Sequence, residues 1–255
     1  MKDNALYLIK RLLSERDDLG EVEIPEISED RFRHYRSLVN IRPAWESDEE
    51  YLTAEEEYLK GLTEAKGITD IDDLSPVEEK IYLWRGDITT LKCGAIVNAA
   101  NSGMTGCYRP CHGCIDNCIH TFAGIRLRLK CDEIMRSQGF EEPTGSAKLT
   151  PAYDLPCESV IHTVGPIVRG RLTEEHCRLL ESCYKSCLEL AVKSGIESIA
   201  FCCISTGVFG FPQREAAEIA VRTVREFVKA HDIRVIFNVF TAEDYDIYSD
   251  ILHRQ

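Results

Sequence analysis

The chain has 255 residues, of which 44% are hydrophobic and 29% charged, a composition typical of a globular protein that buries a core. No segment approaches the ~18 consecutive apolar residues of a membrane span, and the first residues lack the apolar stretch of a secretory signal, so we expect a cytoplasmic protein with no membrane partner. The net charge of −13 is opposite in sign to the basic surface of a nucleic-acid-binding protein and argues against that class.

Acidic residues concentrate in the first third of the chain. Residues 1–80 hold 11 Lys/Arg against 22 Asp/Glu, whereas the remainder is nearly balanced. Apolar residues at helical spacing predict a helix near residues 4–15, a second from about Arg31 until Pro43 stops it, and a third over 48–66. We predict an N-terminal acidic helical extension over residues 1–80 that caps the following domain; an arm that docks a partner is the alternative.

After residue 80, strand and helix patterns alternate along the chain. In order, the sequence predicts a strand and turn over 81–88, a strand over 93–100, a helix over 116–135, a strand over 159–164, a helix over 176–195, a strand over 198–204, a helix over 213–231, a strand over 234–240 and a closing helix over 241–252. This alternation predicts a three-layer α/β domain over residues 81–255.

Twelve cysteines in a chain expected to stay in a reducing compartment are interpreted as packed thiols, metal ligands or reactive groups, not as disulfides. The segment 106–120 is rich in metal-ligand side chains: Cys107, Cys111, His112, Cys114, Cys118 and His120. Thiolates and imidazoles together favour Zn²⁺. Spacing alone does not choose the ligands, and a cluster of buried free thiols is the alternative. Four protein ligands would indicate a structural site, whereas three would leave an open position.

Two further segments follow predicted strands, where open α/β sheets bind ligands. The glycine-rich turn 205–211 links a strand to a helix, a geometry that points backbone N–H groups at an anion, although a plain turn would have the same pattern. Asn101 ends the strand 93–100, and Asp116 lies near the start of the next helix, where a capping role is the alternative. His120 and His162 are interpreted as hydrogen-bonded core histidines.

Six sequence blocks, in this order, resemble the macrodomain family. They are GDIT (86–89), AIVNAANS (95–102), IDNCIHTFAG (115–124), GSAKLTPAYDLP (145–156), VIHTVGP (160–166) and ISTGVFGFP (204–212). Within the family the chain looks like the MacroD-type hydrolases, and more narrowly like their microbial zinc-containing class. That class carries a Cys-x₄-His-x-Cys insertion, which matches Cys107, His112 and Cys114 here, and an acidic helical extension.

The resemblance implies a three-layer αβα macrodomain with a mixed central sheet and an ADP-ribose cleft. Asp87 and the Ile88 backbone would contact adenine, and Phe240 would stack on it. Asn101 would contact the distal ribose, and Asp116 would lie beside the scissile bond at C1″. The diphosphate would be wrapped by backbone groups of one loop, consisting of Ser205, Thr206, Gly207, Val208, Phe209 and Gly210.

The implied activity is hydrolysis of mono-ADP-ribose from a modified protein, at an ester of an Asp or Glu side chain. We expect one zinc ion with an open fourth position next to the distal ribose, and Asp116 to position or deprotonate the attacking water. Cys111, beside His112, is an alternative fourth ligand that would make the metal structural. Partners implied by the resemblance are a sirtuin-type ADP-ribosyltransferase and a lipoyl-carrier protein. A reader that binds ADP-ribose without cleaving it and an O-acetyl-ADP-ribose deacetylase are the alternative functions.

Overall fold

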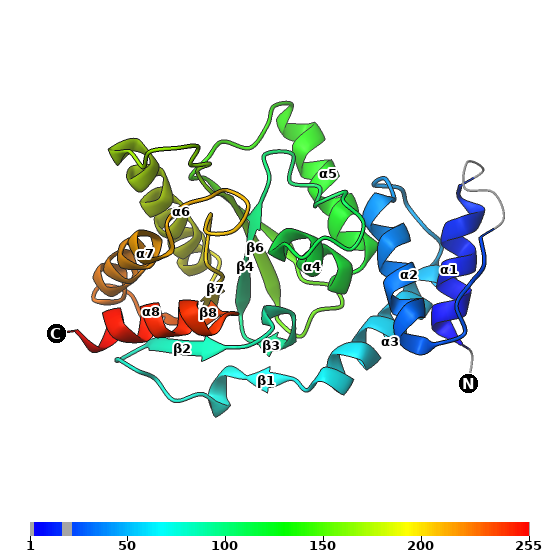
Figure 1. Cartoon of the computed structure of the whole chain (residues 1–255), viewed down its shortest axis with the longest axis horizontal. Coiled ribbons are helices and arrows are strands. Elements are labelled where there is room, and N and C mark those ends of the chain that lie inside the picture. The colour runs from blue at the N-terminus through cyan, green and yellow to red at the C-terminus, as the bar shows by residue number, and fades with distance from the viewer. Residues whose placement is uncertain (1–2, 17–21, 255) are drawn as a thin grey trace.

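The computed structural model describes residues 3–16 and 22–254. Its N-terminal part contains three helices, α1 (Asn4–Ser14), α2 (Ser28–Ile41) and α3 (Glu49–Lys66), and α1 packs on both of the others. Figure 1 shows them at one end of the molecule, next to α4 (Ile115–Phe122) and α5 (Ile125–Gln138), and α2 packs against α4. The three predicted N-terminal helices are therefore present, while residues 1–2 and 17–21 of the predicted extension lie outside the described part.

The remaining chain forms a six-stranded sheet in the order β2-β8-β7-β4-β6-β5. The strands are β2 (Ile81–Arg85), β4 (Ala95–Ala100), β5 (Ala147–Pro151), β6 (Ser159–Val164), β7 (Ser198–Phe201) and β8 (Arg234–Val239). Only β5 is antiparallel to its neighbour, so the sheet is mixed. A separate parallel pair joins β1 (Thr69–Asp70) to β3 (Leu91–Lys92) across the predicted boundary at residue 80, and that boundary stays a prediction.

Helices cover both faces of this sheet (Figure 1). On one side lie α6 (Glu174–Lys193), α7 (Gln213–Val228) and α8 (Ala242–His253), and on the other lie α4 and α5. Two short 3₁₀ helices, η2 (Ile71–Asp73) and η3 (Ile88–Thr90), precede and follow β2 in the chain. The predicted three-layer αβα architecture with a mixed sheet is confirmed. Among the helices of the described ranges, none combines the length and apolar character that crossing a membrane requires.

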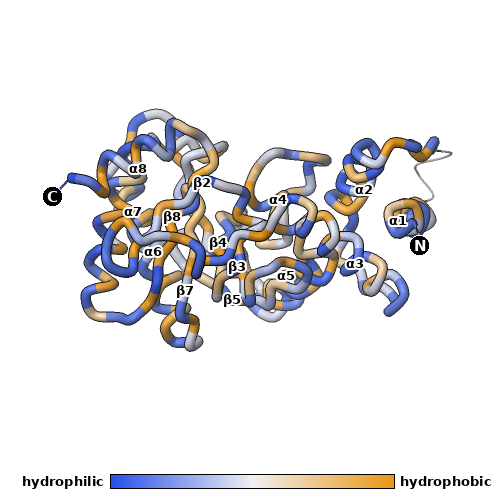
Figure 2. The backbone as a smooth tube through the Cα atoms, turned by 90° about the horizontal axis from the view of Figure 1, so that it is seen from below, coloured by the Kyte–Doolittle hydropathy of each residue, from blue (hydrophilic) through white to orange (hydrophobic). Residues whose placement is uncertain are grey.

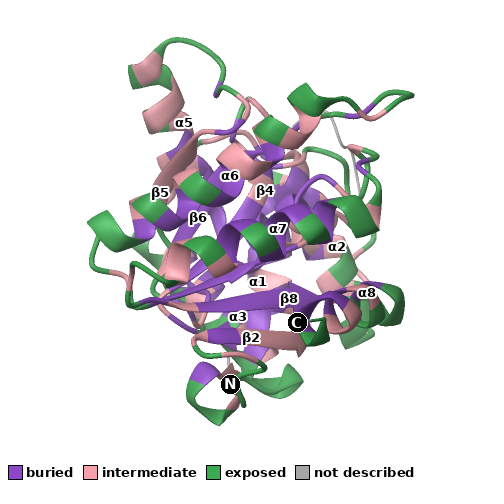
Figure 3. Ribbon diagram, turned by 90° about the vertical axis from the view of Figure 1, so that its left-hand side faces the viewer, coloured by how far each residue is buried: buried purple, intermediate pink, exposed green. Residues whose placement is uncertain are grey.

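The core lies in the central strands, which are covered on both faces. Every residue of β7 is buried, as is every residue of β4 except Ala99, and Figure 3 shows the buried strands enclosed by helices that are exposed on their outer sides. In Figure 2, hydrophobic and hydrophilic residues alternate along these outer helices. A strand buried on both faces is a nearly continuous apolar run, so β4 and β7 are recognisable in the sequence.

The prediction of one continuous helix over 116–135 is wrong, because the chain breaks at Gly124. Gly124 has a φ of +76°, a conformation that L-residues rarely adopt. A Cβ there would lie 2.5 Å from Asp154 Oδ2 and 2.7 Å from Glu55 Oε2. The same Glu55 oxygen accepts a hydrogen bond from the Ile125 N–H (2.9 Å). Two carboxyl groups packed against the backbone therefore separate α4 from α5.

Smaller differences occur at other element ends. Strand β5 was not predicted, because four of its residues are half-buried or exposed and show no apolar run. The strand predicted over 198–204 ends at Phe201, and the helix predicted over 213–231 ends at Val228. Both ends lie next to turns, where boundaries depend on capping rather than on periodicity.

Glu55, a fully buried residue of α3, joins the N-terminal helices to α5. Its Oε1 accepts hydrogen bonds from the hydroxyls of Tyr35 (2.7 Å) and Tyr51 (3.2 Å). Burial raises the pKa of Glu55 to about 7, although the hydrogen bonds from Tyr35 and the Ile125 N–H act in the opposite direction. The carboxyl group therefore keeps its proton in the folded protein at pH values where an unfolded chain has lost it.

We expect Glu55→Gln to remove part of the pH dependence of folding. The folded pKa lies above the ordinary value of 4.5, so the wild-type free energy of unfolding falls as pH rises from about 4.5 to 7 and is constant above. The decrease is about 3 kcal/mol at most. Denaturant unfolding between pH 5 and 8 should show the stability of Glu55→Gln rising relative to wild type across this window.

Glu56→Gln is the matched control for this measurement. Glu56 is the next residue on α3, and its pKa is lowered by the hydrogen bond from Lys60, so it does not titrate in this window. If Glu55→Gln and wild type have parallel stability profiles, the carboxyl group of Glu55 is ionised throughout and the account of this contact is wrong.

Candidate active site

The candidate site residues gather at the carboxyl edge of the parallel strands. Strand β4 pairs with β7 only through Ala95–Ile199 and Ile96–Ala200, so the two strands separate toward their carboxyl ends. The chain turns to opposite sides of β4 to form β6 and β7, and ligands bind at such a switch point in open α/β sheets. The loop after β4 and the loop after β7 border this opening.

Asp116, in the first turn of α4, accepts hydrogen bonds from two amide side chains. Asn98 Nδ2 donates to its Oδ1 (2.8 Å), and Asn101 Nδ2 donates to its Oδ2 (3.1 Å). Burial raises the pKa of Asp116 to about 6, opposed by the Asn98 hydrogen bond, the charge of Arg128 and the Asn101 hydrogen bond. The structure thus brings together Asn101 and Asp116, which are fifteen positions apart, and adds Asn98.

Two buried histidines lie behind this carboxylate. His162 Nδ1 contacts Asn98 Nδ2 (3.1 Å), and its Nε2 contacts Thr150 Oγ1 (2.9 Å). His120 Nε2 is 3.6 Å from Asp116 Oδ1, and neither His120 nitrogen has a hydrogen-bond partner within the described chain. Burial lowers the pKa of both rings, that of His162 to about 3, so both are neutral at physiological pH. Both lie in the core, as the sequence predicted, but among the described residues only His162 makes the predicted hydrogen bonds.

The loop between β4 and α4 carries the predicted metal ligands. The ligand atoms of Cys107, His112 and Cys114 all lie within 4.8 Å of one another, and all three residues are half-buried. Cys107 Sγ and His112 Nδ1 are 3.6 Å apart. The thiol of Cys111 contacts the Arg33 carbonyl instead (3.4 Å). A second group, formed by His120, Cys131 and His162, is fully buried.

The glycine-rich loop after β7, residues 205–211, has an unusual backbone. Ser205 is buried with a φ of +66°, and its hydroxyl has no hydrogen-bond partner among the described residues. Val168 N–H donates to the Phe209 carbonyl (2.8 Å) and so fixes the far side of the loop. Within the described ranges, the N–H groups of Gly207, Val208 and Phe209 donate no hydrogen bond. Such a row of free donors suits an anion.

Asp87 and Phe240 follow the adjacent strands β2 and β8, whose ends are paired as Arg85–Val239. Phe240 is 76% exposed, which leaves its ring free to stack. Asp87 Oδ1 caps η3 through Thr89, and its Oδ2 accepts from Lys66 Nζ of α3 (2.8 Å). Burial opposes ionisation, but the Lys66 and Thr89 contacts outweigh it and lower the pKa of Asp87.

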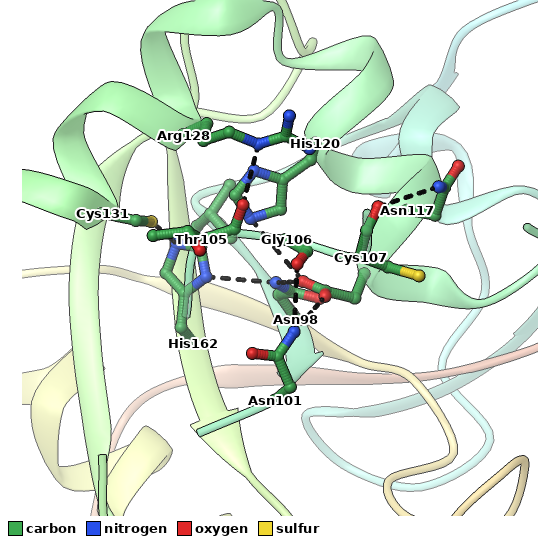
Figure 4. A network of polar contacts seen from close by, with 12 residues as sticks. Asn98, Asn101, Thr105, Gly106, Cys107, Asn117, His120, Arg128, Cys131 and His162 are labelled. Carbon is green, nitrogen blue, oxygen red and sulfur yellow. Dashed lines mark hydrogen bonds and ion pairs between the residues drawn. The ribbon is translucent and has the colours of Figure 1, made fainter. Parts of the chain in front are cut away.

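Sequence reasoning missed the long-range supports of this site. Lys66, Arg36 and Arg128 lie on helices where a basic residue normally faces solvent, so no local pattern marks them. Arg128 is only 5% exposed, and its guanidinium donates to the Thr105 carbonyl (2.8 Å), as Figure 4 shows. Asn98 carried a signal, because an amide inside a buried apolar strand needs a polar partner.

Comparison with known proteins identifies relatives along nearly the whole chain. A family model described as "Macro domain" matches residues 97–220. A protein-ADP-ribose hydrolase of Treponema medium is 51% identical over 257 residues, covering 98% of each chain. A protein of the same name from Staphylococcus aureus (strain MRSA252) is 48% identical over 255 residues, covering 97% of this chain and 94% of its own.

Solved structures show the same fold. A Trypanosoma brucei macrodomain in complex with ADP-ribose superposes with a TM-score of 0.63 and 32% identity, covering 84% of this chain and 94% of its own. An Oceanobacillus iheyensis macrodomain has a TM-score of 0.62 and 38% identity, covering 68% of this chain and 91% of its own.

We expect Gly106→Ala to destabilise the site loop. Gly106 has a φ of +88°, and a Cβ there would lie 2.8 Å from Cγ of His120. The strain should lower the free energy of unfolding by roughly 1–3 kcal/mol, measured by denaturant titration. Gly113→Ala in the same loop is the control: it meets nothing within 4 Å and should change stability by less than about 0.5 kcal/mol. Equal effects of the two substitutions would contradict this geometry.

Proposed function

The chain belongs to the macrodomain family and is a protein-ADP-ribose hydrolase, and on that premise we propose that it cleaves mono-ADP-ribose from an ester at an Asp or Glu side chain with the help of one bound zinc ion. One observation carries the proposal. The Asn101–Asp116 pair lies at the carboxyl edge of the sheet, and the loop that joins these two residues holds three metal donors.

The donor set fits zinc. Zn²⁺ binds thiolate sulfur at ~2.3 Å and imidazole nitrogen at ~2.0 Å, so two such ligands of a tetrahedral ion are about 3.5 Å apart. The Cys107 Sγ to His112 Nδ1 separation is 3.6 Å, and Cys114 completes a three-ligand set. When bound with three protein ligands, zinc supplies Lewis-acid polarisation at its fourth position.

Asp116 acts on water in this proposal. Its carboxylate, oriented by Asn98 and Asn101, accepts a proton from a water placed beside C1″ of the distal ribose. The water oxygen forms a bond to C1″ while the bond from C1″ to the acceptor carboxylate breaks, and that carboxylate leaves with the electron pair. The products are free ADP-ribose and the restored Asp or Glu side chain. Asn101 also contacts the distal ribose.

The rest of ADP-ribose occupies the edge from β4 to β2. Backbone groups of residues 205–210 hold the diphosphate, which suits a chain of net charge −13 because peptide dipoles replace basic side chains. The adenine amino group donates to Asp87, the Ile88 backbone completes the contact, and Phe240 stacks on the ring. The Lys66–Asp87 ion pair leaves Asp87 ionised and able to accept.

The modified protein and its modifying enzyme are further parts of the proposal. On the resemblance in sequence, the mark is placed by a sirtuin-type ADP-ribosyltransferase on a lipoyl-carrier protein. A reducing cytoplasm is the proposed location, since all twelve cysteines have free thiols and two of them, Cys107 and Cys114, are proposed zinc donors.

The test is release of ADP-ribose from an Asp/Glu-modified protein by the zinc-loaded chain. We expect wild type to release it, and Cys107→Ala to lose bound zinc and at least about a hundredfold in turnover, because a metal contributes several kcal/mol to charge stabilisation. Zinc content is measured by elemental analysis and folding by circular dichroism. Cys177→Ala, which removes a half-buried thiol on α6, is the control and should retain zinc and activity.

Three results would contradict this function. Full turnover by zinc-free Cys107→Ala would show that the metal takes no part in the reaction. Tight calorimetric binding of ADP-ribose with no release by wild type would indicate a reader. Activity on O-acetyl-ADP-ribose with none on modified protein would indicate a deacetylase.

A further inference from the structure

We propose that helix α2 of the N-terminal extension is part of the metal-binding unit, with Arg36 as the positioning residue that holds the His112 backbone and, through Asn117, the Cys107 backbone. The role of the loop in hydrolysis rests on the proposed function. The contacts that hold the loop do not depend on that function. Zinc affinity therefore tests these contacts separately from catalysis.

The metal loop needs external support because residues 101–114, between β4 and α4, form neither helix nor strand. Few of its backbone groups pair locally; Met104 N–H to the Asn101 carbonyl (3.0 Å) and His112 N–H to the Arg109 carbonyl (3.2 Å) are two that do. Metal ligands must be held within a few tenths of an ångström for tight binding, which a loop of this kind does not achieve alone.

Arg36 reaches the loop from α2, about 76 residues away in sequence. Its Nη2 donates to the carbonyl of His112 (2.8 Å), itself a proposed ligand. Its Nε and Nη2 both donate to Asn117 Oδ1 (3.1 and 2.7 Å). The planar guanidinium group of Arg36 thus donates hydrogen bonds to two acceptors in fixed directions. The ammonium group of a lysine does not reproduce this forked geometry.

Asn117 links Arg36 to a second proposed ligand, Cys107, by hydrogen bonds. Its Nδ2 donates to the carbonyl of Cys107 (3.2 Å) and to that of Arg109 (3.0 Å), and Figure 4 shows the link between Asn117 and Cys107. Asn117 is fully buried, so its orientation is set by these partners and by Arg36. A single guanidinium therefore fixes the backbone at two of the three donors.

Asn40, one helical turn after Arg36 on α2, holds Cys111, which lies between the proposed ligands Cys107 and His112 in the sequence. Its Oδ1 accepts from the N–H of Cys111 (2.9 Å), and its Nδ2 donates to Thr121 Oγ1 (3.0 Å). Cys111 has a φ of +52°, a conformation that a non-glycine residue keeps only when its surroundings impose it. Arg128 adds a third link, because its guanidinium bonds both the Thr105 carbonyl of the loop and the Val39 carbonyl at the end of α2.

The acceptors around Arg36 indicate a positioning role rather than a simple ion pair. They are a carbonyl oxygen, an amide oxygen and the Cys118 sulfur (3.4 Å), all in or next to the metal loop. A basic side chain that served only solubility would face solvent or an acidic neighbour. The positive charge is instead satisfied by neutral groups whose directions it sets.

The experiment compares Arg36→Gln with Arg33→Gln in the full-length chain. Arg33 lies on the same helix with an exposed side chain. Zinc affinity is measured by competition with a chromogenic chelator, beginning from metal-free protein, and the melting temperature of the metal-free protein is recorded. We expect Arg36→Gln to weaken zinc binding at least tenfold and Arg33→Gln to remain within twofold of wild type.

Arg36→Lys and a combined variant complete the test. Arg36→Lys keeps the charge but not the fork, and should also weaken zinc binding; it decides the question if Arg36→Gln does not fold. If Arg36 acts through the metal, Arg36→Gln should lower turnover far less in a Cys107→Ala background than in wild type. A purely structural role would instead lower the melting temperature and leave zinc affinity unchanged.

Wild-type zinc affinity in a folded Arg36 variant would overturn this inference while leaving the hydrolase proposal intact. Conversely, a wild-type chain that binds zinc but releases no ADP-ribose would refute the proposed function, and the zinc affinities of the Arg36 variants would still decide the role of α2.

Discussion

The site depends on how one irregular segment, residues 101–114, is held between the sheet and the N-terminal helices. Backbone polar groups in such a segment must find partners, and here the partners are side chains from elsewhere in the chain. Arg36 and Asn40 reach it from α2, and Arg128 reaches it from α5. The segment begins at Asn101, carries the three proposed metal donors and ends just before Asp116. Its placement therefore sets the relative positions of every group proposed to act on the distal ribose.

The charged and polar groups of the site interact mainly with side-chain amides and backbone N–H groups rather than with a cluster of basic side chains. Asp116 is buried and held by two amides, and the histidines behind it are neutral because burial opposes their protonation. On the other side of the opening, the loop after β7 carries N–H groups that donate no hydrogen bond among the described residues. An acidic chain is compatible with an anionic ligand when fixed peptide dipoles, with a metal for the distal ribose, take the place of lysines.

The sequence predicts the features that depend on neighbouring residues, but it does not predict contacts between residues far apart in the chain. Strands β4 and β7 are nearly continuous apolar runs, and the three proposed metal donors lie within eight positions, so the strands and the donor cluster were predictable. Gly124 breaks a helix because Glu55 and Asp154 pack against it, and no local pattern places those carboxylates there. Arg36 and Lys66 lie on amphipathic helices, where a basic residue usually faces solvent, yet they contact Asn117 and Asp87, 81 and 21 positions away. Tertiary packing alone determines these pairings.

The central claim is that one metal ion and the Asn101–Asp116 pair act on the same ribose. The most direct test is a crystal structure of the zinc-loaded chain with ADP-ribose, with the metal located by anomalous scattering. The account predicts a single zinc peak among Cys107, His112 and Cys114, with the distal ribose between that peak and Asp116. A zinc peak among His120, Cys131 and His162, or a distal ribose turned away from Asp116, would contradict it.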